Sequence, residues 1–383
     1  MIRTITCVGG ALLAFAVMGC GAEPLPEEMA AAAVAPLGAK LQVTPKQAVG
    51  LSLFSDTNLS SPAGQSCASC HTLSHGAVDP DSGIPTSEGA ILGRFGDRNT
   101  PTAFYAQYSP AFHHDADGGT YVGGQFWDGR ATSLEEQAKG PFLNPIEMNN
   151  ASKAAVVTKV QSSVYAGLFK QVYGAAVFSN VNAAYDDIAD AIATFERMPG
   201  FAPFNSRYDA YLAGTGTLTA QELSGLALFE DPAKGNCSAC HPSRASSDGT
   251  PPLFTDFTYD NLGIPKNPNN PFYTMPAQFK PAGAAFVDRG LGGALGDPNE
   301  DGRFKVSTLR NLGKTGPYGH NGYFPDLHSV VDFYNSRDVV AGPPAEIPAT
   351  VNHNELGNLG LSAQEVNDIV AFLGTLDDRS REH

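Results

Sequence analysis

Two short segments of the chain share one pattern: Cys67-Ala68-Ser69-Cys70-His71 and Cys237-Ser238-Ala239-Cys240-His241. In each segment, two cysteines separated by two residues are followed at once by a histidine. This Cys-x-x-Cys-His pattern is typical of c-type haem attachment, because two thiols form thioethers with the porphyrin and the adjacent imidazole binds the iron. The sequence therefore predicts two covalently bound haems, with His71 and His241 as proximal iron ligands.

The cysteine count supports this prediction. The chain holds six cysteines, of which Cys7 lies in an expected export signal and Cys20 in an expected lipidation site. The two motifs use the other four. Two disulfides, a zinc site or redox-active dithiols are the alternatives for such pairs in an exported protein. The histidine directly after each pair favours haem over all three.

The composition indicates a globular protein rather than a disordered or fibrous one. Of 383 residues, 42% are hydrophobic and 16% are charged, while 41 glycines and 28 prolines indicate many loops. At roughly 100–200 residues per domain, this length suggests two domains. The formal net charge of -15 argues against a nucleic-acid partner, which needs a basic surface, and weakly favours a basic protein partner.

The chain repeats itself around the two motifs. Gly50-Leu51-Ser52-Leu53-Phe54 precedes the first motif, and Gly225-Leu226-Ala227-Leu228-Phe229 precedes the second. Each half also ends in a predicted amphipathic helix that we expect to pack over the opening one. The apolar positions of these helices are Ile188, Ile192 and Phe195 in the first half and Val366, Ile369, Val370 and Leu373 in the second.

We therefore expect a mainly α fold of two cytochrome c-like haem domains with long loops and little β structure. The domain boundary is expected near Gly214-Thr215-Gly216. The expected segments are a signal peptide over 1–19, a flexible tether over 20–46, an N-terminal haem domain over 47–212 and a C-terminal haem domain over 213–383.

The N-terminal residues have the order of an export signal, because Arg3 precedes an apolar run from Cys7 to Met18. Val17-Met18-Gly19-Cys20 resembles a bacterial lipoprotein cleavage box, which predicts lipid on Cys20 and a Pro/Ala-rich tether after it. The alternative is an ordinary signal peptide that is cut a few residues later. We expect a periplasmic protein that is attached to the outer membrane by its lipid alone.

Longer motifs lie between and after the haem sites. They are Arg98-Asn99-Thr100-Pro101, Phe126-Trp127-Asp128-Gly129-Arg130, Asn144-Pro145-Ile146-Glu147-Met148, Phe304 to Asn311 and Thr315 to Gly322. With these motifs the chain, from about Gly50 onward, closely resembles the bacterial di-haem cytochrome c peroxidase family, which includes MauG. The resemblance implies an oxidoreductase that uses hydrogen peroxide as its oxidant.

The resemblance implies three residues of a peroxide-cleaving centre. Glu147 corresponds to the acid/base of the family, which moves a proton between the peroxide oxygens and contributes a factor of roughly 10²–10⁴. Gln137 lines the same pocket, and Trp127, the only tryptophan of the chain, stands between the haems as an electron bridge. The structural alternatives are a solvated or capping Glu147 and a Trp127 that fills the core.

A calcium ion between the domains is also implied, held by Asn99, Thr315 and Pro317. One side-chain oxygen, two backbone carbonyls and waters form the hard-oxygen set that suits this ion. Alternatively, Asn99 is a turn residue before Thr100-Pro101.

The chain departs from the peroxidase pattern where the first haem is blocked. In reductively activated members, a histidine eight or nine residues before the asparagine of the Arg-Asn motif occupies the first iron, but here Ala90 and Ile91 stand at those positions. His75 follows the proximal ligand too closely to reach the opposite face, and the pair His113-His114 is a weak substitute. We expect the first haem to keep an open position that meets peroxide without a reductive switch.

A second departure concerns the sixth ligand of the second haem. Where ordinary members have a methionine, seventeen residues after Pro317, this chain has Tyr334, as MauG does. Asp326 is expected to cap a helix that turns Tyr334 inward. Met275, in a proline-rich loop, is the rival ligand, and a buried tyrosine that does not bind iron is the third alternative. A phenolate lowers the haem potential, whereas a thioether raises it.

Three functions are compatible with these patterns. The leading hypothesis is a peroxidase that reduces hydrogen peroxide to water, with electrons from a small cytochrome c or cupredoxin entering through the C-terminal haem and Trp127. The second is MauG-like oxidation of Trp or Tyr side chains in a partner protein. The third, a non-enzymatic electron-transfer cytochrome, is disfavoured by Glu147 and the open iron. A homodimer is compatible with all three.

Overall fold

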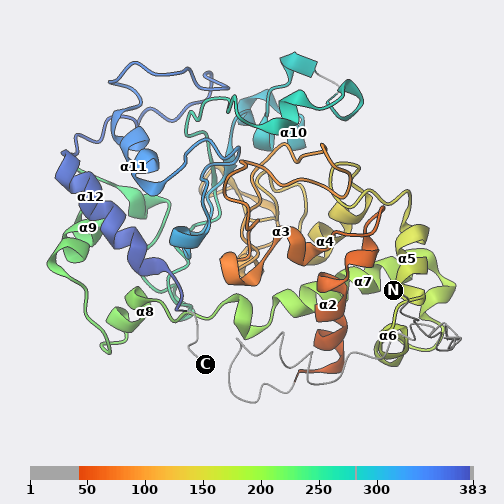
Figure 1. The fold of residues 1–383 in the computed structure, drawn as a ribbon. Coiled ribbons are helices and arrows are strands. Elements are labelled where there is room, and N and C mark those ends of the chain that lie inside the picture. Colours follow the sequence, from red (N-terminus) through yellow and green to blue (C-terminus); the bar gives the residue numbers. More distant parts are fainter. Residues whose placement is uncertain (1–42, 281–282, 380–383) are drawn as a thin grey trace, which may run out of the picture.

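The computed structural model describes residues 43–280 and 283–379 (Figure 1). The fold over these ranges is mainly helical, as predicted. The α-helices in these ranges are α2 (Pro45–Ser55), α3 (Cys67–Cys70), α4 (Leu134–Leu143), α5 (Lys153–Gln161), α6 (Ala166–Tyr173), α7 (Val181–Glu196), α8 (Arg207–Leu212), α9 (Ala220–Glu230), α10 (Gly290–Leu295), α11 (Leu327–Ser336) and α12 (Ala363–Leu373), and short 3-10 turns lie between them. The predicted export signal, Cys20 and most of the predicted tether lie outside the described residues.

Sheet structure is sparse and antiparallel in the described ranges. Strand β1 (His113–Asp115) pairs with β2 (Thr120–Val122), so that His113 faces Val122. Strand β3 (Tyr259–Asp260) pairs with β4 (Phe304–Lys305), so that Tyr259 faces Lys305. The second pair joins segments that are far apart in the sequence and supports one wall of the site described below.

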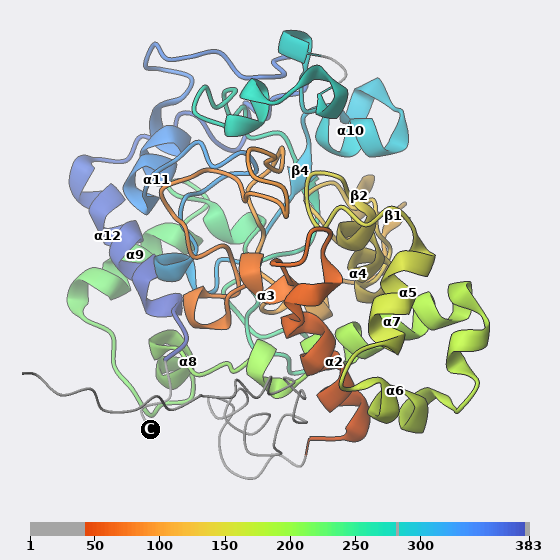
Figure 2. The ribbon, with the colours of Figure 1, turned by 45° about the vertical axis from the view of Figure 1, so that its right-hand side comes forward.

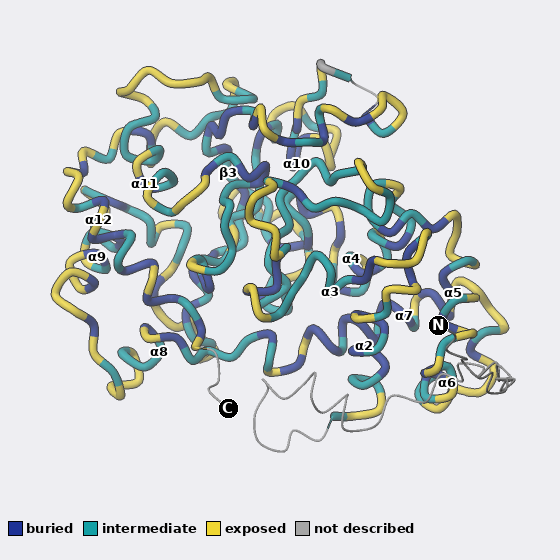
Figure 3. Tube along the Cα trace, viewed as in Figure 1, coloured by how far each residue is buried: buried dark blue, intermediate teal, exposed yellow. Residues whose placement is uncertain are grey.

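The hydrophobic core divides into two clusters that follow the chain. One contains buried residues between Val49 and Phe201, and the other contains buried residues between Tyr208 and Leu376. In Figure 1 the helices of the first cluster lie on one side and α8, α9, α11 and α12 on the other, with long loops between them. Figure 3 shows that the outer loops carry most of the exposed stretches. The change of cluster comes a few residues before the boundary predicted at 212, and the division into two domains stays a prediction.

The repeated glycines explain how each half is assembled. Helix α2 packs against α7, and α9 packs against α12, as both Figure 1 and Figure 2 show for the second pair. A Cβ atom on Gly50 would lie 2.1 Å from the Ala191 carbonyl oxygen, and one on Gly225 would lie 1.9 Å from that of Asp368. Only glycine allows backbones to approach this closely. The predicted packing of opening and closing helices is therefore confirmed.

An ion-pair network fixes the loops of the two halves against each other. The Arg98 guanidinium donates to both carboxylate oxygens of Asp288 at 2.7 Å and to Asp128 at 2.7 Å. The side chain of Arg98 is 13% exposed and both carboxylates are 7% exposed. Such bidentate, partly buried pairs define geometry strongly. They hold the segments of Asn99 and Trp127 against the C-terminal half.

Candidate active site

The histidines of the two motifs have the same local geometry. His71 follows α3 and its Nδ1 lies 3.0 Å from the carbonyl oxygen of Ala77, while the Nδ1 of His241 lies 2.7 Å from that of Phe254. Burial lowers the pKa of both imidazoles, so the rings are neutral and donate from Nδ1. A carbonyl partner on Nδ1 leaves Nε2 as the nitrogen that can bind a metal.

The four motif cysteines are free thiols rather than disulfides. Burial raises the pKa of Cys70, Cys237 and Cys240 to about 12, and it raises that of Cys67 further. Surroundings that disfavour thiolates suit neutral thioethers better than a zinc site, whose ligands are thiolates. The thiol chemistry therefore fits covalent haem attachment.

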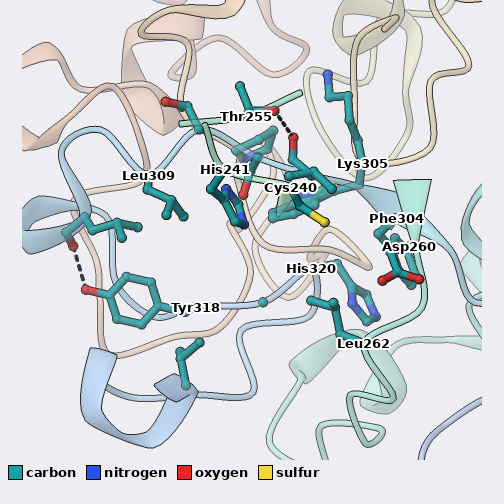
Figure 4. Close-up of a pocket in the computed structure, with 18 of the residues that line it drawn as sticks. Cys240, His241, Thr255, Asp260, Leu262, Phe304, Lys305, Leu309, Tyr318 and His320 are labelled. Carbon is teal, nitrogen blue, oxygen red and sulfur yellow. Dashed lines mark hydrogen bonds between the residues drawn. The ribbon is translucent and has the colours of Figure 1, made fainter. Parts of the chain in front are cut away.

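A cavity of about 300 Å³ lies beside the second motif. Cys237, Cys240 and His241 line it together with Tyr334 and His320. Figure 4 shows Cys240, His241 and His320 around this space. The His320 ring stacks on Phe304 with centroids 3.6 Å apart, and both of its nitrogens are buried without a hydrogen-bond partner.

These residues pass a test for haem binding. A haem carries an apolar ring, which matches the cavity, and two carboxylates, one of which would accept from the protonated nitrogen of His320, a buried donor that otherwise has no partner. Cys237, Cys240 and His241 would hold the second haem, and Cys67, Cys70 and His71 the first.

Tyr334 and Met275 lie in different surroundings. Tyr334 is on α11, which begins after the Asp326 cap that the sequence predicted. It lines the cavity, and burial raises the pKa of its phenol. The Met275 sulfur instead accepts a hydrogen bond from the backbone nitrogen of Phe95 at 3.0 Å. The fold therefore brings Tyr334, rather than its rival, to the wall of the haem cavity, and iron ligation by it stays a prediction.

Glu147 lies in a tight turn after α4. Backbone nitrogens of Glu147 and Asn149 donate to the Asn144 carbonyl oxygen at 3.1 Å and 2.9 Å. Burial raises the pKa of Glu147 to about 7, with Arg130 lowering it, Asp97 raising it and the Asn144 side chain lowering it. Its charge in turn raises the pKa of Cys67 and Cys70, which places the carboxyl near the first haem motif. Gln137 is half-buried on α4 itself.

Trp127 lies where the halves meet. Its indole nitrogen donates to the carbonyl oxygen of Asn99 at 2.8 Å, and its own carbonyl accepts from the nitrogen of Lys305 in the C-terminal half at 2.8 Å. The nitrogen of Asn99 donates to the carbonyl oxygen of His320 at 2.8 Å. Trp127 also lines the haem cavity. This position is compatible with the predicted electron bridge.

The three residues of the implied calcium site are brought together. Asn99, Thr315 and Pro317 line a second, small cavity of about 10 Å³, as do Asp79 and Asp81. This is the space of about one water molecule or ion. The Asn99 amide nitrogen donates to Pro85 at 3.0 Å, so the amide oxygen is the atom left for a ligand. Over the described ranges, no cluster of three His, Cys, Asp or Glu side chains could hold a metal, and calcium binding stays a prediction.

The other histidines that were weighed as iron ligands lie at the surface. His113 and His114 are exposed on β1, and His75 is exposed beyond the first motif. The sequence analysis missed three residues that shape the site: Arg130 and Asp97, whose charges adjust the pKa of Glu147 that burial raises, and the orphaned His320. Arg130 and His320 lie inside motifs that were recognised in the sequence, and Asp97 directly precedes another. The motifs therefore indicated the segments of these residues but not what each residue does.

Comparisons with known proteins agree with this geometry. The model of the "Di-haem cytochrome c peroxidase" family matches residues 44–217. The chain is 40% identical over 354 residues to the methylamine utilization protein MauG of Paracoccus denitrificans, covering 88% of this chain and 89% of MauG. It is 29% identical to the cytochrome c551 peroxidase of Pseudomonas aeruginosa, covering 93% of this chain and 84% of that protein.

Solved structures support the same assignment. The diheme peroxidase BthA of Burkholderia thailandensis superimposes with a TM-score of 0.78 at 32% identity, covering 90% of this chain and 88% of that one. Over the described residues, no helix is long and apolar enough to cross a membrane. On the strength of its fold, its two haem motifs and these relatives, the chain belongs to the di-haem cytochrome c peroxidase and MauG family of oxidoreductases.

Proposed function

We propose that this protein reduces hydrogen peroxide to water at the haem held by Cys67, Cys70 and His71, with Glu147 as the acid/base. The overall reaction consumes one peroxide, two electrons and two protons and forms two waters. The haem supplies the iron at which the peroxide bond breaks. The chain's own residues supply the proton transfer, the electron route and the shape of the pocket.

The proposal rests on the place of Glu147, which lies in the turn after α4 near the first haem motif and whose pKa burial raises to about 7. A general acid/base works best when its pKa lies near the operating pH, because both protonation states are then populated. Glu147 can accept a proton from one oxygen of peroxide and return it to the departing oxygen. Gln137, one helix earlier, lines the pocket in this proposal.

The second haem serves as the electron-transfer centre. Its proposed ligands are His241 and Tyr334, and Trp127 connects it to the first haem. A small cytochrome c or cupredoxin is the proposed donor, and Asn99, Thr315 and Pro317 hold a calcium ion between the halves. The protein acts in the periplasm, anchored through lipid on Cys20.

A second candidate is peroxide-dependent oxidation of Trp or Tyr side chains in a partner protein. Two observations favour it: the 40% identity to a methylamine utilization protein MauG and the position of Tyr334 on the cavity wall. Phenolate ligation lowers the haem potential and stabilises oxidised iron, which suits a centre that holds oxidising equivalents. Oxidising equivalents would then leave towards a protein substrate.

The experiment compares the di-haem protein with its Glu147→Gln variant in reaction with peroxide. Glu136→Gln is the matched control, since Glu136 is exposed on α4 and pairs only with Lys139. We expect Glu147→Gln to slow the reaction at least ~100-fold and the control to be unchanged. A Glu147→Gln protein that keeps both haems and the wild-type rate would refute the proposal. Rapid donor oxidation supports the first function, whereas a mass change in a co-incubated protein partner supports the second.

A further inference from the structure

We propose that Arg94 is a positioning residue that clamps the loop 87–96 against the Glu147 turn and thereby holds the Glu147 carboxyl in place. This loop, called the distal loop below, contains Ala90 and Ile91, the positions at which the blocking histidine is expected in reductively activated members. The inference rests on the proposed function, because it assigns a support to the proposed acid/base.

Arg94 bonds to both sides of Glu147. Its Nη1 donates to the carbonyl oxygen of Pro145 at 3.0 Å and to the side-chain oxygen of Asn149 at 3.0 Å. A third bond joins the loop to Glu147 itself, since the Ala90 nitrogen donates to the Glu147 carbonyl oxygen at 2.8 Å. The turn that carries the carboxyl is therefore fixed before, at and after that residue.

Asn149 has a backbone that needs this support. Its φ of 55° lies in the left-handed region, which costs energy for any residue other than glycine and is tolerated best by asparagine and aspartate. The Asn149 side chain donates to the carbonyl oxygen of Ser61 at 2.6 Å while its oxygen accepts from Arg94. Arg94 thus completes the bonding of the one strained residue in the turn.

The distal loop is built as a close-fitting element. Its ends are joined by a bond from the nitrogen of Gly96 to the carbonyl oxygen of Ser87 at 2.9 Å, and Gly93 donates to the Glu88 carboxylate at 2.6 Å. A Cβ atom on Gly89 would lie 2.3 Å from the Ile146 carbonyl oxygen. The loop therefore lies directly on the backbone of the Glu147 turn, with no space for a side chain between them.

The C-terminal half holds the outer face of the same loop. The Arg94 guanidinium lies 4.0 Å from the centre of the Phe279 ring, a cation–π arrangement. The sulfur of Met275 accepts a hydrogen bond from the backbone nitrogen of Phe95 at 3.0 Å. Arg94 is therefore sandwiched between the Glu147 turn and the half that carries the second haem.

The test compares Arg94→Gln with Arg94→Lys in the di-haem protein. Arg244→Gln is the control, because the side chain of Arg244 is 84% exposed. Three quantities are measured: the rate of the peroxide reaction, hydrogen exchange of the Ala90 amide, and the pH profile of cyanide binding to the first haem. Cyanide enters as a weak acid and needs a base in the pocket, so it reports on Glu147 without peroxide turnover.

We expect Arg94→Gln to slow the peroxide reaction at least ~10-fold and to speed exchange of the Ala90 amide at least ~10-fold. The acid limb of cyanide binding should move to lower pH, because a released Glu147 becomes more hydrated. Arg94→Lys should recover part of each change, since an ammonium keeps the charge but cannot donate from a planar fork. The control should match the wild type.

Unchanged exchange and an unchanged cyanide profile in Arg94→Gln would overturn the clamp, even if the peroxide rate fell. If Arg94→Gln loses haem, the Phe279→Leu variant is measured instead, because it removes only the ring that stacks on Arg94. Faster exchange of the Ala90 amide in Phe279→Leu would then support the clamp, and unchanged exchange would overturn it. A wild-type protein that does not consume peroxide would refute the proposed function alone, because the exchange and cyanide measurements still test the clamp.

Discussion

The pH dependence of the peroxide reaction tests the role of Glu147 most sharply. With a pKa of about 7, only ~1% of this carboxyl is ionised at pH 5, about 10% at pH 6 and about 90% at pH 8. Because the ionised form accepts the peroxide proton, the second-order rate constant should fall ~100-fold between pH 8 and pH 5. A glutamate with an ordinary pKa of about 4.3 would stay mostly ionised at pH 5 and produce almost no fall.

Two neighbouring charged residues allow the pKa of Glu147 to be shifted in opposite directions. Arg130 lowers the pKa of Glu147 and Asp97 raises it. Arg130→Gln should therefore move the acid limb of the rate profile to higher pH, whereas Asp97→Asn should move it to lower pH. Variants that merely disturb the fold would not produce opposite shifts.

The assay is stopped-flow absorbance of the ferric di-haem protein mixed with peroxide from pH 5 to pH 9. The wild type, the two charge variants and the Arg244→Gln surface control are compared. A rate constant that is flat from pH 5 to pH 8, or two variants whose acid limbs move in the same direction, would exclude Glu147 as the titrating acid/base.

Three further predictions follow from packing, burial and ligation. Gly50→Ala and Gly225→Ala should each lower the free energy of unfolding by about 1–3 kcal/mol or more, because the new Cβ meets a backbone oxygen, whereas Gly167→Ala, with nothing within 4 Å, should be neutral or stabilising in denaturant titrations. Burial raises the pKa of Glu196 to about 8, so the folded state keeps a proton that the unfolded state loses from about pH 4.5, and stability falls as the pH rises towards 8. Glu196→Gln should therefore gain stability over the wild type across that range, and equal melting temperatures at pH 8 would contradict this. Tyr334→Phe should keep both haems but lose any tyrosinate-to-iron absorption band, and a band that persists would exclude Tyr334 as the ligand.

The local chemistry of the haem motifs could be predicted because it is contained in consecutive residues. Two thiols and an imidazole within five positions meet whatever the rest of the chain does. Helix α7 through Ile188 and Ile192, helix α12 and the Asp326 cap were predictable for the same reason, since periodicity and capping act over a few residues.

Other features depended on segments that meet only in three dimensions. The pKa of Glu147 is set by burial together with Arg130 and Asp97, and the Arg94 clamp joins the distal loop to a turn about fifty residues away and to Phe279. The orphaned nitrogens of His320 and the different surroundings of Tyr334 and Met275 could not be read from spacing.

From the sequence alone we could predict which residues attach the haems, that the fold is helical and repeated, and which family motifs the chain carries. The acidity of Glu147, the candidate ligand that lines the haem cavity and the contacts that hold the distal loop depend on how the whole chain packs. The physical reason is range: covalent attachment, capping and helical periodicity act along the chain, whereas desolvation, charge interactions and close packing depend on every segment that folds around a group.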